Sequence, residues 1–100
     1  MFNNKSIFIT GGTGSFGNKF VEKILKNYKP KKLIIFSRDE FKQHQMNKIF
    51  SKEKFKCLRY FIGDVRDKER LLKAMYNVDY VIHAAALKQV DAAEYNPIEY

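Results

Sequence analysis

Hydrophobic residues occur along the chain in short continuous runs that alternate with stretches of helical spacing. The runs lie at Lys5 to Thr10, Lys32 to Phe36, Leu58 to Ile62 and Asp79 to Ala84, and each predicts a β-strand. In the second run the residues Leu, Ile, Ile and Phe follow one another, which is typical of a strand buried on both faces.

Between the runs, apolar residues recur at the spacing of an amphipathic helix. One helix is predicted from Phe16 toward Pro30, a polar and weakly amphipathic one from Asp39 to about Phe50, and a third from Asp67 to Asn77. Strands that alternate with helices are typical of an α/β domain with a parallel sheet. The residues expected to face inward are Phe20, Val21, Ile24 and Leu25 in the first helix and Leu71, Leu72 and Met75 in the third.

The composition narrows the class of protein. One hundred residues, 45% hydrophobic and 30% charged, fit one globular domain or part of a larger one. No apolar run is long enough to span a membrane, and the amino end lacks the pattern of a secretory signal. Cys57 is the sole cysteine, which excludes disulfide frameworks and thiolate metal clusters. We expect a cytoplasmic protein with no membrane partner and no metal.

The net charge of +8 is concentrated in residues 19–59, which hold 13 lysines or arginines against 4 acidic residues. Such a basic segment leaves open a module that binds nucleic acid or another polyanion. We favour the interpretation that Lys19, Lys23 and Lys26 form the solvated face of a helix, while basic residues near Arg38 serve a phosphorylated cofactor. Nucleic acid is then not a partner.

The segment from Thr10 to Gly17, TGGTGSFG, is the strongest motif and fits three nucleotide-binding patterns. A P-loop requires Lys and then Ser or Thr after its last glycine, but Asn18 and Lys19 follow here. A protein-kinase loop leads into a strand and a V-A-x-K lysine, whereas the residues after Gly17 have helical spacing. A dinucleotide site requires a strand before the turn, a helix after it and a specificity residue at the end of the next strand, and all three are present.

The dinucleotide interpretation predicts a doubly wound Rossmann fold whose first four strands have the order 3-2-1-4. Glycines let the backbone turn tightly and approach a pyrophosphate, which the N–H groups and the positive end of the following helix stabilise. Residues 1–100 are therefore predicted to be the amino-terminal part of a dinucleotide-binding domain. The candidate contacts in the turn are Gly11, Thr13, Gly14, Ser15, Phe16 and Gly17.

The end of the second strand distinguishes the nicotinamide cofactors, because an acidic residue there binds the ribose hydroxyl of NAD and a cation suits the 2′-phosphate of NADP. Arg38, with Ser37 and Lys42 nearby, favours NADP. Asp39 favours NAD, because a carboxylate about 4 Å from a phosphate charge costs on the order of 4 kcal/mol at an effective dielectric of about 20. This conflict disappears if Asp39 caps the helix that begins there. We predict NADP.

The third and fourth strands also end in candidate site residues. Asp64 is expected to accept a hydrogen bond from the adenine amine, and Val65 to cover the adenine ring. His83 is interpreted as a packed histidine rather than a catalyst, and the small side chain of Ala84 lets the backbone pass close to the cofactor. Lys88 is expected at the mouth of the crevice, where cofactor and substrate both lie.

Several strings resemble those of the inverting UDP-N-acetylglucosamine 4,6-dehydratases, which are extended short-chain dehydrogenase/reductases: ITGGTGSFG, FSRDEFKQ, FIGDVRDKERL, HAAALKQV and AAEYNP. The resemblance covers nearly all 100 residues. GGTGSFG and GDVRD are shared with related polysaccharide-biosynthesis dehydratases, SRDE-x-K-Q and HAAALKQV are more specific, and YKP with AAEYNP points to the pseudaminic acid branch. One departure is Asp91, where the family usually has proline.

The resemblance implies a lyase that recycles NADP and is a homo-oligomer when full length. In such enzymes carbon 4 of UDP-N-acetylglucosamine is oxidised, water is eliminated across carbons 5 and 6, and hydride returns to carbon 6 with inversion at carbon 5. The alternative is another extended short-chain dehydrogenase/reductase acting on a nucleotide sugar, an epimerase or a reductase. By resemblance the NADP contacts are Thr13 to Phe16, Ser37, Arg38, Asp39, Glu40, Phe41, Lys42, Asp64, Val65 and Ala84, and Lys88 contacts both NADP and the sugar nucleotide.

Catalysis in this family needs an Asp-Lys pair and a Tyr-x-x-x-Lys motif, and we identify neither in the chain. Tyr28 and Lys32 have the spacing, but Pro30 lies between them and prevents a shared helical face. The string from Asn96 to Glu99, NPIE, is typical of a helix start, and the chain stops one residue later. We therefore expect the front portion of a longer protein, inactive by itself as a dehydratase.

Overall fold

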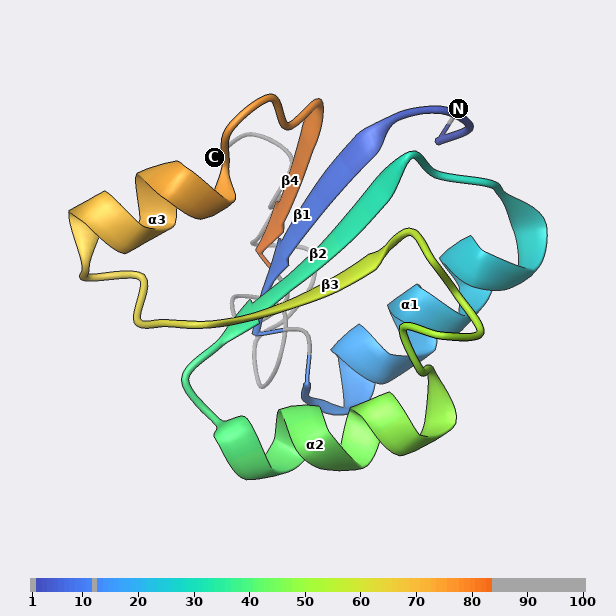
Figure 1. The fold of residues 1–100 in the computed structure, drawn as a ribbon, viewed down its shortest axis with the longest axis horizontal. Coiled ribbons are helices and arrows are strands. Elements are labelled where there is room, and N and C mark those ends of the chain that lie inside the picture. Colours follow the sequence, from blue (N-terminus) through green and yellow to red (C-terminus); the bar gives the residue numbers. More distant parts are fainter. Residues whose placement is uncertain (1, 12, 84–100) are drawn as a thin grey trace, which may run out of the picture.

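A computed structural model of the chain describes residues 2–11 and 13–83. It contains one four-stranded sheet in the order β3-β2-β1-β4, in which all neighbouring strands are parallel (Figure 1). This order confirms the predicted α/β doubly wound Rossmann arrangement. The elements are β1 (Ser6–Thr10), α1 (Ser15–Asn27), β2 (Lys32–Ser37), α2 (Glu40–Ile49), β3 (Leu58–Ile62), α3 (Lys68–Ala74) and β4 (Tyr80–His83).

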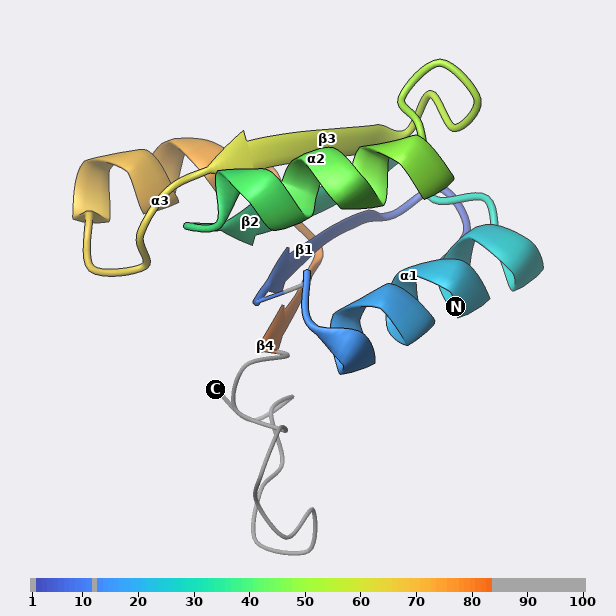
Figure 2. The same cartoon turned by 90° about the horizontal axis from the view of Figure 1, so that it is seen from below.

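The helices cover both faces of the sheet, with α1 and α2 on one side and α3 on the other (Figure 2). Alternate residues of β1 and β2 therefore enter two separate cores. Ile7 and Ile35 pack with α1 and α2, whereas Phe8 and Phe36 pack against α3. The consecutive apolar residues of β2 are buried on both faces, as its sequence predicted.

Helix α1 follows its predicted pattern closely. Val21 and Ile24 are buried, and the helix ends at Asn27, ahead of Pro30. Its lysines at positions 19, 23 and 26 are exposed, which agrees with a solvated basic face. Phe20 and Leu25 are partly buried against the same core.

Helix α3 differs from its prediction in length and in one residue of its inward face. Leu71 and Met75 pack on the core around Phe8, but Leu72 is 68% exposed. Ala74 takes the inward place and is 4% exposed. Successive residues are about 100° apart around a helix, so Leu72 is turned away from the face that residues 71, 74 and 75 form against the sheet.

Strand β4 begins at Tyr80, one residue later than predicted, and Asp79 lies just before it. The Asp79 carboxylate accepts a hydrogen bond of 2.8 Å from the Ser6 N–H, and the Asp79 N–H donates to the Ser6 carbonyl oxygen at 2.8 Å. These two bonds align β4 with the beginning of β1. Ala84, the predicted last residue of the strand, lies outside the described residues.

Gly63, just after β3, leaves no room for a side chain. A Cβ there would lie 2.6 Å from Cζ of Phe36, whose ring is fully buried and packs on Phe8 and Phe61. We expect Gly63→Ala to lower the free energy of unfolding by about 1–3 kcal/mol, measured by chemical denaturation. The loss should be smaller in a Phe36→Leu background, and equal losses in both backgrounds would contradict the steric explanation.

Candidate functional site

A cleft of about 440 Å³ lies where the strands end at the carboxyl edge of the sheet. Ligands of doubly wound folds bind at this edge, where the strand order reverses between β1 and β4. The cleft brings together residues from three strand ends. These are Gly11 from the glycine turn (residues 11–14), Ser37 and Arg38 at the end of β2, and Asp64 and Val65 after β3. The complete lining is Thr10, Gly11, Phe36, Ser37, Arg38, Gly63, Asp64, Val65, Arg66 and His83.

Gly11 and Gly14 shape the turn between β1 and α1 in different ways. Gly11 has φ 66°, in the left-handed region that favours glycine, and its N–H donates to the Phe36 carbonyl oxygen at 3.1 Å. Gly14 has φ −77° and ψ −179°, which any residue can adopt, and a Cβ there would meet only the Gly11 oxygen at 3.7 Å. Gly12 lies outside the described residues.

Helix α1 begins directly after this turn. Gly14 is its N-cap residue and supplies no capping side chain, so the first N–H groups of the helix depend on other partners. Ser15 and Phe16 at the first turn are exposed, Thr13 is half-buried, and Gly17 is buried. The positive end of the helix is therefore exposed, and it begins four residues after Gly11, which lines the cleft.

The connection from β2 to α2 consists of Arg38 and Asp39. The Asp39 carboxylate accepts a hydrogen bond from the Lys42 N–H at 2.9 Å, which confirms the predicted N-cap. Arg38 lines the cleft, and its side chain is 73% exposed. Three further candidates, Glu40, Phe41 and Lys42, are exposed in the first turn of α2.

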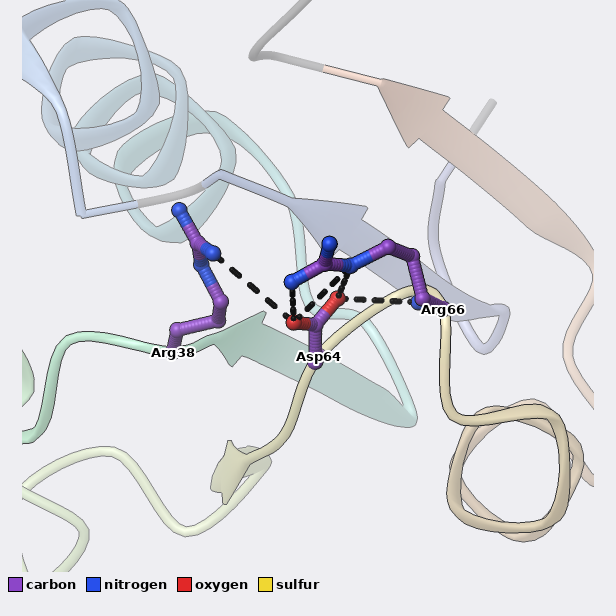
Figure 3. Close-up of polar contacts among 3 residues, drawn as sticks. All are labelled: Arg38, Asp64 and Arg66. Carbon is purple, nitrogen blue, oxygen red and sulfur yellow. Dashed lines mark hydrogen bonds and ion pairs between the residues drawn. The ribbon is translucent and has the colours of Figure 1, made fainter.

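Asp64 lies between two arginines at one wall of the cleft (Figure 3). Its carboxylate accepts hydrogen bonds from Arg66, from Nη2 at 2.8 Å and from the backbone N–H at 2.9 Å. Arg38 Nη1 lies 3.7 Å from the same carboxylate. The hydrogen bonds from Arg66 lower the pKa of Asp64 to about 2. The three charges sum to one positive charge at the end of β2 and β3.

Substitution Arg66→Gln is expected to raise the pKa of Asp64 toward its ordinary value, because the side-chain bonds from Arg66 are the largest cause of the shift. Since the pKa is lower in the folded chain, the Asp64 carboxylate stabilises the fold above the ordinary value of 3.8, and this contribution is lost as the pH falls toward about 2. Carboxyl carbon NMR titration measures the pKa directly. An unchanged pKa in the variant would contradict this account.

His83 lies at the end of β4 beside the glycine turn. It is half-buried, and its Nδ1 forms a hydrogen bond with the Thr10 hydroxyl, which suits the interpretation of a packed histidine. Ala84 and Lys88, the remaining candidates, lie outside the described residues, as does Asp91. Within the residues that the structure describes, no group of three or more His, Cys, Asp or Glu side chains is arranged to hold a metal ion.

The apparent Tyr-x-x-x-Lys motif is a coincidence of spacing. Tyr28 follows the last residue of α1, and Lys32 begins β2, so the two do not share a helix. This confirms the prediction that the two residues share no helical face. No helix within residues 2–11 and 13–83 combines the length and apolar character that a membrane crossing requires.

Two polar residues near the cleft were not among the predicted site residues. The Asn18 side chain donates to the carbonyl oxygens of Gly14 at 2.9 Å and Thr13 at 3.1 Å, which braces the glycine turn. Gln43, only 4% exposed, connects α2 with the ends of β2 and β3. The sequence does hold a signal for Gln43, because it lies three residues before the apolar Met46. It is thus a polar residue on the inward face of a helix, where it needs hydrogen-bond partners.

Comparison with known proteins finds relatives whose names are those of UDP-sugar enzymes. The chain is 64% identical over 99 residues to a UDP-N-acetylglucosamine 4,6-dehydratase (inverting) of Campylobacter jejuni, and 50% identical over 102 residues to a UDP-glucose 4-epimerase of Rickettsia massiliae. Each alignment covers 99% of this chain and 29% of the relative. The crystal structure of Pen from Bacillus thuringiensis is 42% identical with a TM-score of 0.77, over 98% of this chain and 30% of that one.

The chain thus spans less than a third of the length of these relatives, 29% in both cases. A family model described as polysaccharide biosynthesis protein matches residues 7–100, which include every described strand and helix except the first residue of β1. The chain therefore belongs to the polysaccharide biosynthesis protein family.

Proposed function

We propose that this chain forms the NADP-binding portion of an inverting UDP-N-acetylglucosamine 4,6-dehydratase. One observation carries the proposal: the glycine turn, Arg38 and Asp64 converge on a single cleft at the carboxyl edge of the sheet. The 64% identity to the Campylobacter jejuni dehydratase supports the choice of reaction. The product would be a UDP-4-keto-6-deoxy-N-acetylhexosamine for a surface glycan, made by a cytoplasmic enzyme.

The residues present fit a dinucleotide phosphate. Gly14 adopts a conformation open to any residue and has only ordinary contact at its Cβ position, so the absence of a side chain there is explained by the close approach of a ligand. The N–H groups at the start of α1 supply donors for the pyrophosphate. Arg38 is exposed toward the cleft and supplies a cation for the 2′-phosphate.

The choice of NADP over NAD depends on Asp39. Its carboxylate is engaged by the Lys42 N–H, so it caps α2 instead of competing for a ribose hydroxyl. The remaining carboxylate nearby, Asp64, is neutralised by Arg66. Arg38 is then the charge that decides the preference, as a 2′-phosphate requires.

NADP bound in this cleft would supply the hydride acceptor at carbon 4 and the hydride donor at carbon 6, so that the net reaction is a dehydration. The described residues would hold its adenosine and phosphate end: Gly14 and the first turn of α1 face the pyrophosphate, and Asp64 and Val65 lie where the adenine would be. We assign no catalytic residue to this chain. Lys88 is proposed to contact both NADP and the sugar nucleotide.

A second candidate function is C4 epimerisation of a UDP-sugar. The specific observation in its favour is the 50% identity to the Rickettsia massiliae UDP-glucose 4-epimerase over the same region. Both functions use one cofactor site, so the described residues do not choose between them.

Incubation of the full-length protein with UDP-N-acetylglucosamine and NADP, followed by proton NMR, separates the two. A dehydratase produces a new methyl doublet from carbon 6 and loses the carbon 4 proton. An epimerase produces no methyl group and changes only the couplings of the carbon 4 proton. Unchanged substrate would contradict both functions.

A further inference from the structure

Gln43 places a buried amide behind the wall of the cleft. Its Nε2 lies 2.9 Å from Ser37 Oγ, 3.1 Å from the Phe61 carbonyl oxygen and 3.4 Å from the Ser37 carbonyl oxygen. Carbonyl oxygens only accept hydrogen bonds, so the NH₂ group, not the amide oxygen, must face this side. Gln43 is therefore a donor to the ends of two neighbouring strands.

This contact determines what the Ser37 hydroxyl can do. Its oxygen accepts from Gln43, which leaves its O–H free to donate. Ser37 lines the cleft, whereas Gln43 does not. A phosphate at physiological pH presents mainly acceptor oxygens, so a hydroxyl fixed as a donor is the arrangement that suits it.

The same contact holds the turn that carries Arg38. The Gln43 side chain donates to the Ser37 hydroxyl before the turn at 2.9 Å, and its backbone N–H donates to the Asp39 carbonyl oxygen after the turn at 3.0 Å. The Lys42 N–H binds the Asp39 side chain as well. Arg38 is thus the one residue between two held positions.

We propose that Gln43 is a positioning residue for phosphate recognition, acting through the Ser37 hydroxyl and the Arg38 turn. The inference rests on the proposed function, since it takes the 2′-phosphate of NADP as the ligand. Gln43 does not touch the ligand. Its role is to present one neutral donor and one cation to the same phosphate.

The test compares NADP with NAD, because only NADP carries the phosphate. In Gln43→Met, which keeps the length of the side chain and removes its donors, the Kd for NADP is expected to rise about tenfold, and that for NAD less than about twofold. Gln45→Met is the matched control, since Gln45 is exposed on the same helix, and should leave both constants unchanged. Calorimetric titration of the purified protein measures all four constants.

A double-mutant cycle that combines Gln43→Met with Ser37→Ala tests whether Gln43 affects NADP binding through the Ser37 hydroxyl. If Gln43 acts through the Ser37 hydroxyl, the two substitutions together weaken NADP binding by less than the product of their separate effects. Ser37→Ala alone should also weaken NADP selectively, which keeps the proposal testable if Gln43→Met does not fold.

Equal weakening of NADP and NAD in Gln43→Met would overturn the inference and leave the proposed function intact, because it would reveal a structural role only. Equal affinity of Ser37→Ala and the parent for NADP would also overturn it. A parent protein that binds neither dinucleotide would overturn the proposed function and this inference together.

Discussion

Gly14→Val is expected to abolish detectable dinucleotide binding while the protein remains folded. The backbone at Gly14 has φ −77° and ψ −179°, which valine adopts readily, and a Cβ meets only the Gly11 oxygen at 3.7 Å. At an N-cap position the exchange costs the fold about 1 kcal/mol or less. The added methyl groups would occupy the space through which a pyrophosphate approaches the backbone, so binding is lost for steric reasons.

Titration of NADP into the parent, Gly14→Ala and Gly14→Val gives a graded series, because the alanine variant adds one methyl group and the valine variant three carbons. Thermal unfolding of each variant is the control for folding. A Gly14→Val protein that unfolds like the parent and binds NADP with the parent affinity would show that the glycine turn only connects β1 to α1.

Arg38→Ala is expected to remove most of the preference for NADP over NAD. A hydrogen bond to a charged group contributes about 1.5–3 kcal/mol, which corresponds to roughly 10- to 150-fold in the Kd for NADP. The Kd for NAD should change little, because NAD has no 2′-phosphate. The fold should tolerate the change, since the Arg38 side chain is 73% exposed and surface ion pairs contribute little to stability.

Lys48→Ala is the matched control for Arg38→Ala, because it removes the same charge from the last turn of α2, away from the cleft. If the basic surface attracted NADP only through its general charge, both variants would weaken binding to a similar extent and the effect would disappear with salt. Equal affinity of the parent for NADP and NAD would contradict the role given to Arg38.

The positions of the strands and the start of α2 follow from local patterns in the sequence, and the strand order follows from the dinucleotide-binding motif. The bounds of β3 match its apolar run, and the Asp39 cap matches the polar residue before a helix, because both depend on nearest neighbours along the chain. Gly11 likewise has the positive φ that a tight turn after β1 needs. The sequence alone therefore predicts the strands and turns that end at the edge of the cleft.

The contacts across elements do not follow from such patterns. The helical spacing predicted that Leu72 faces inward, but the sheet covers another side of α3 and Leu72 is exposed. Gln43 bonds to residues 6 and 18 positions away, and Asp64 meets Arg38 across two neighbouring strand ends. Strand register and twist determine which residues of different elements come into contact. The hydrophobic periodicity of a single segment predicts neither of them.

Whether NADP binds at the carboxyl edge of this sheet can be measured by amide chemical-shift mapping of the isotope-labelled protein during titration with NADP. We expect the amide signals of Gly11, Gly14, Ser15 and Arg38 to move together and saturably. Those of Asn27 and Lys29, which line a hollow at the opposite end of α1, should stay in place. Shifts confined to Asn27 and Lys29, or no shifts at saturating NADP, would contradict the account.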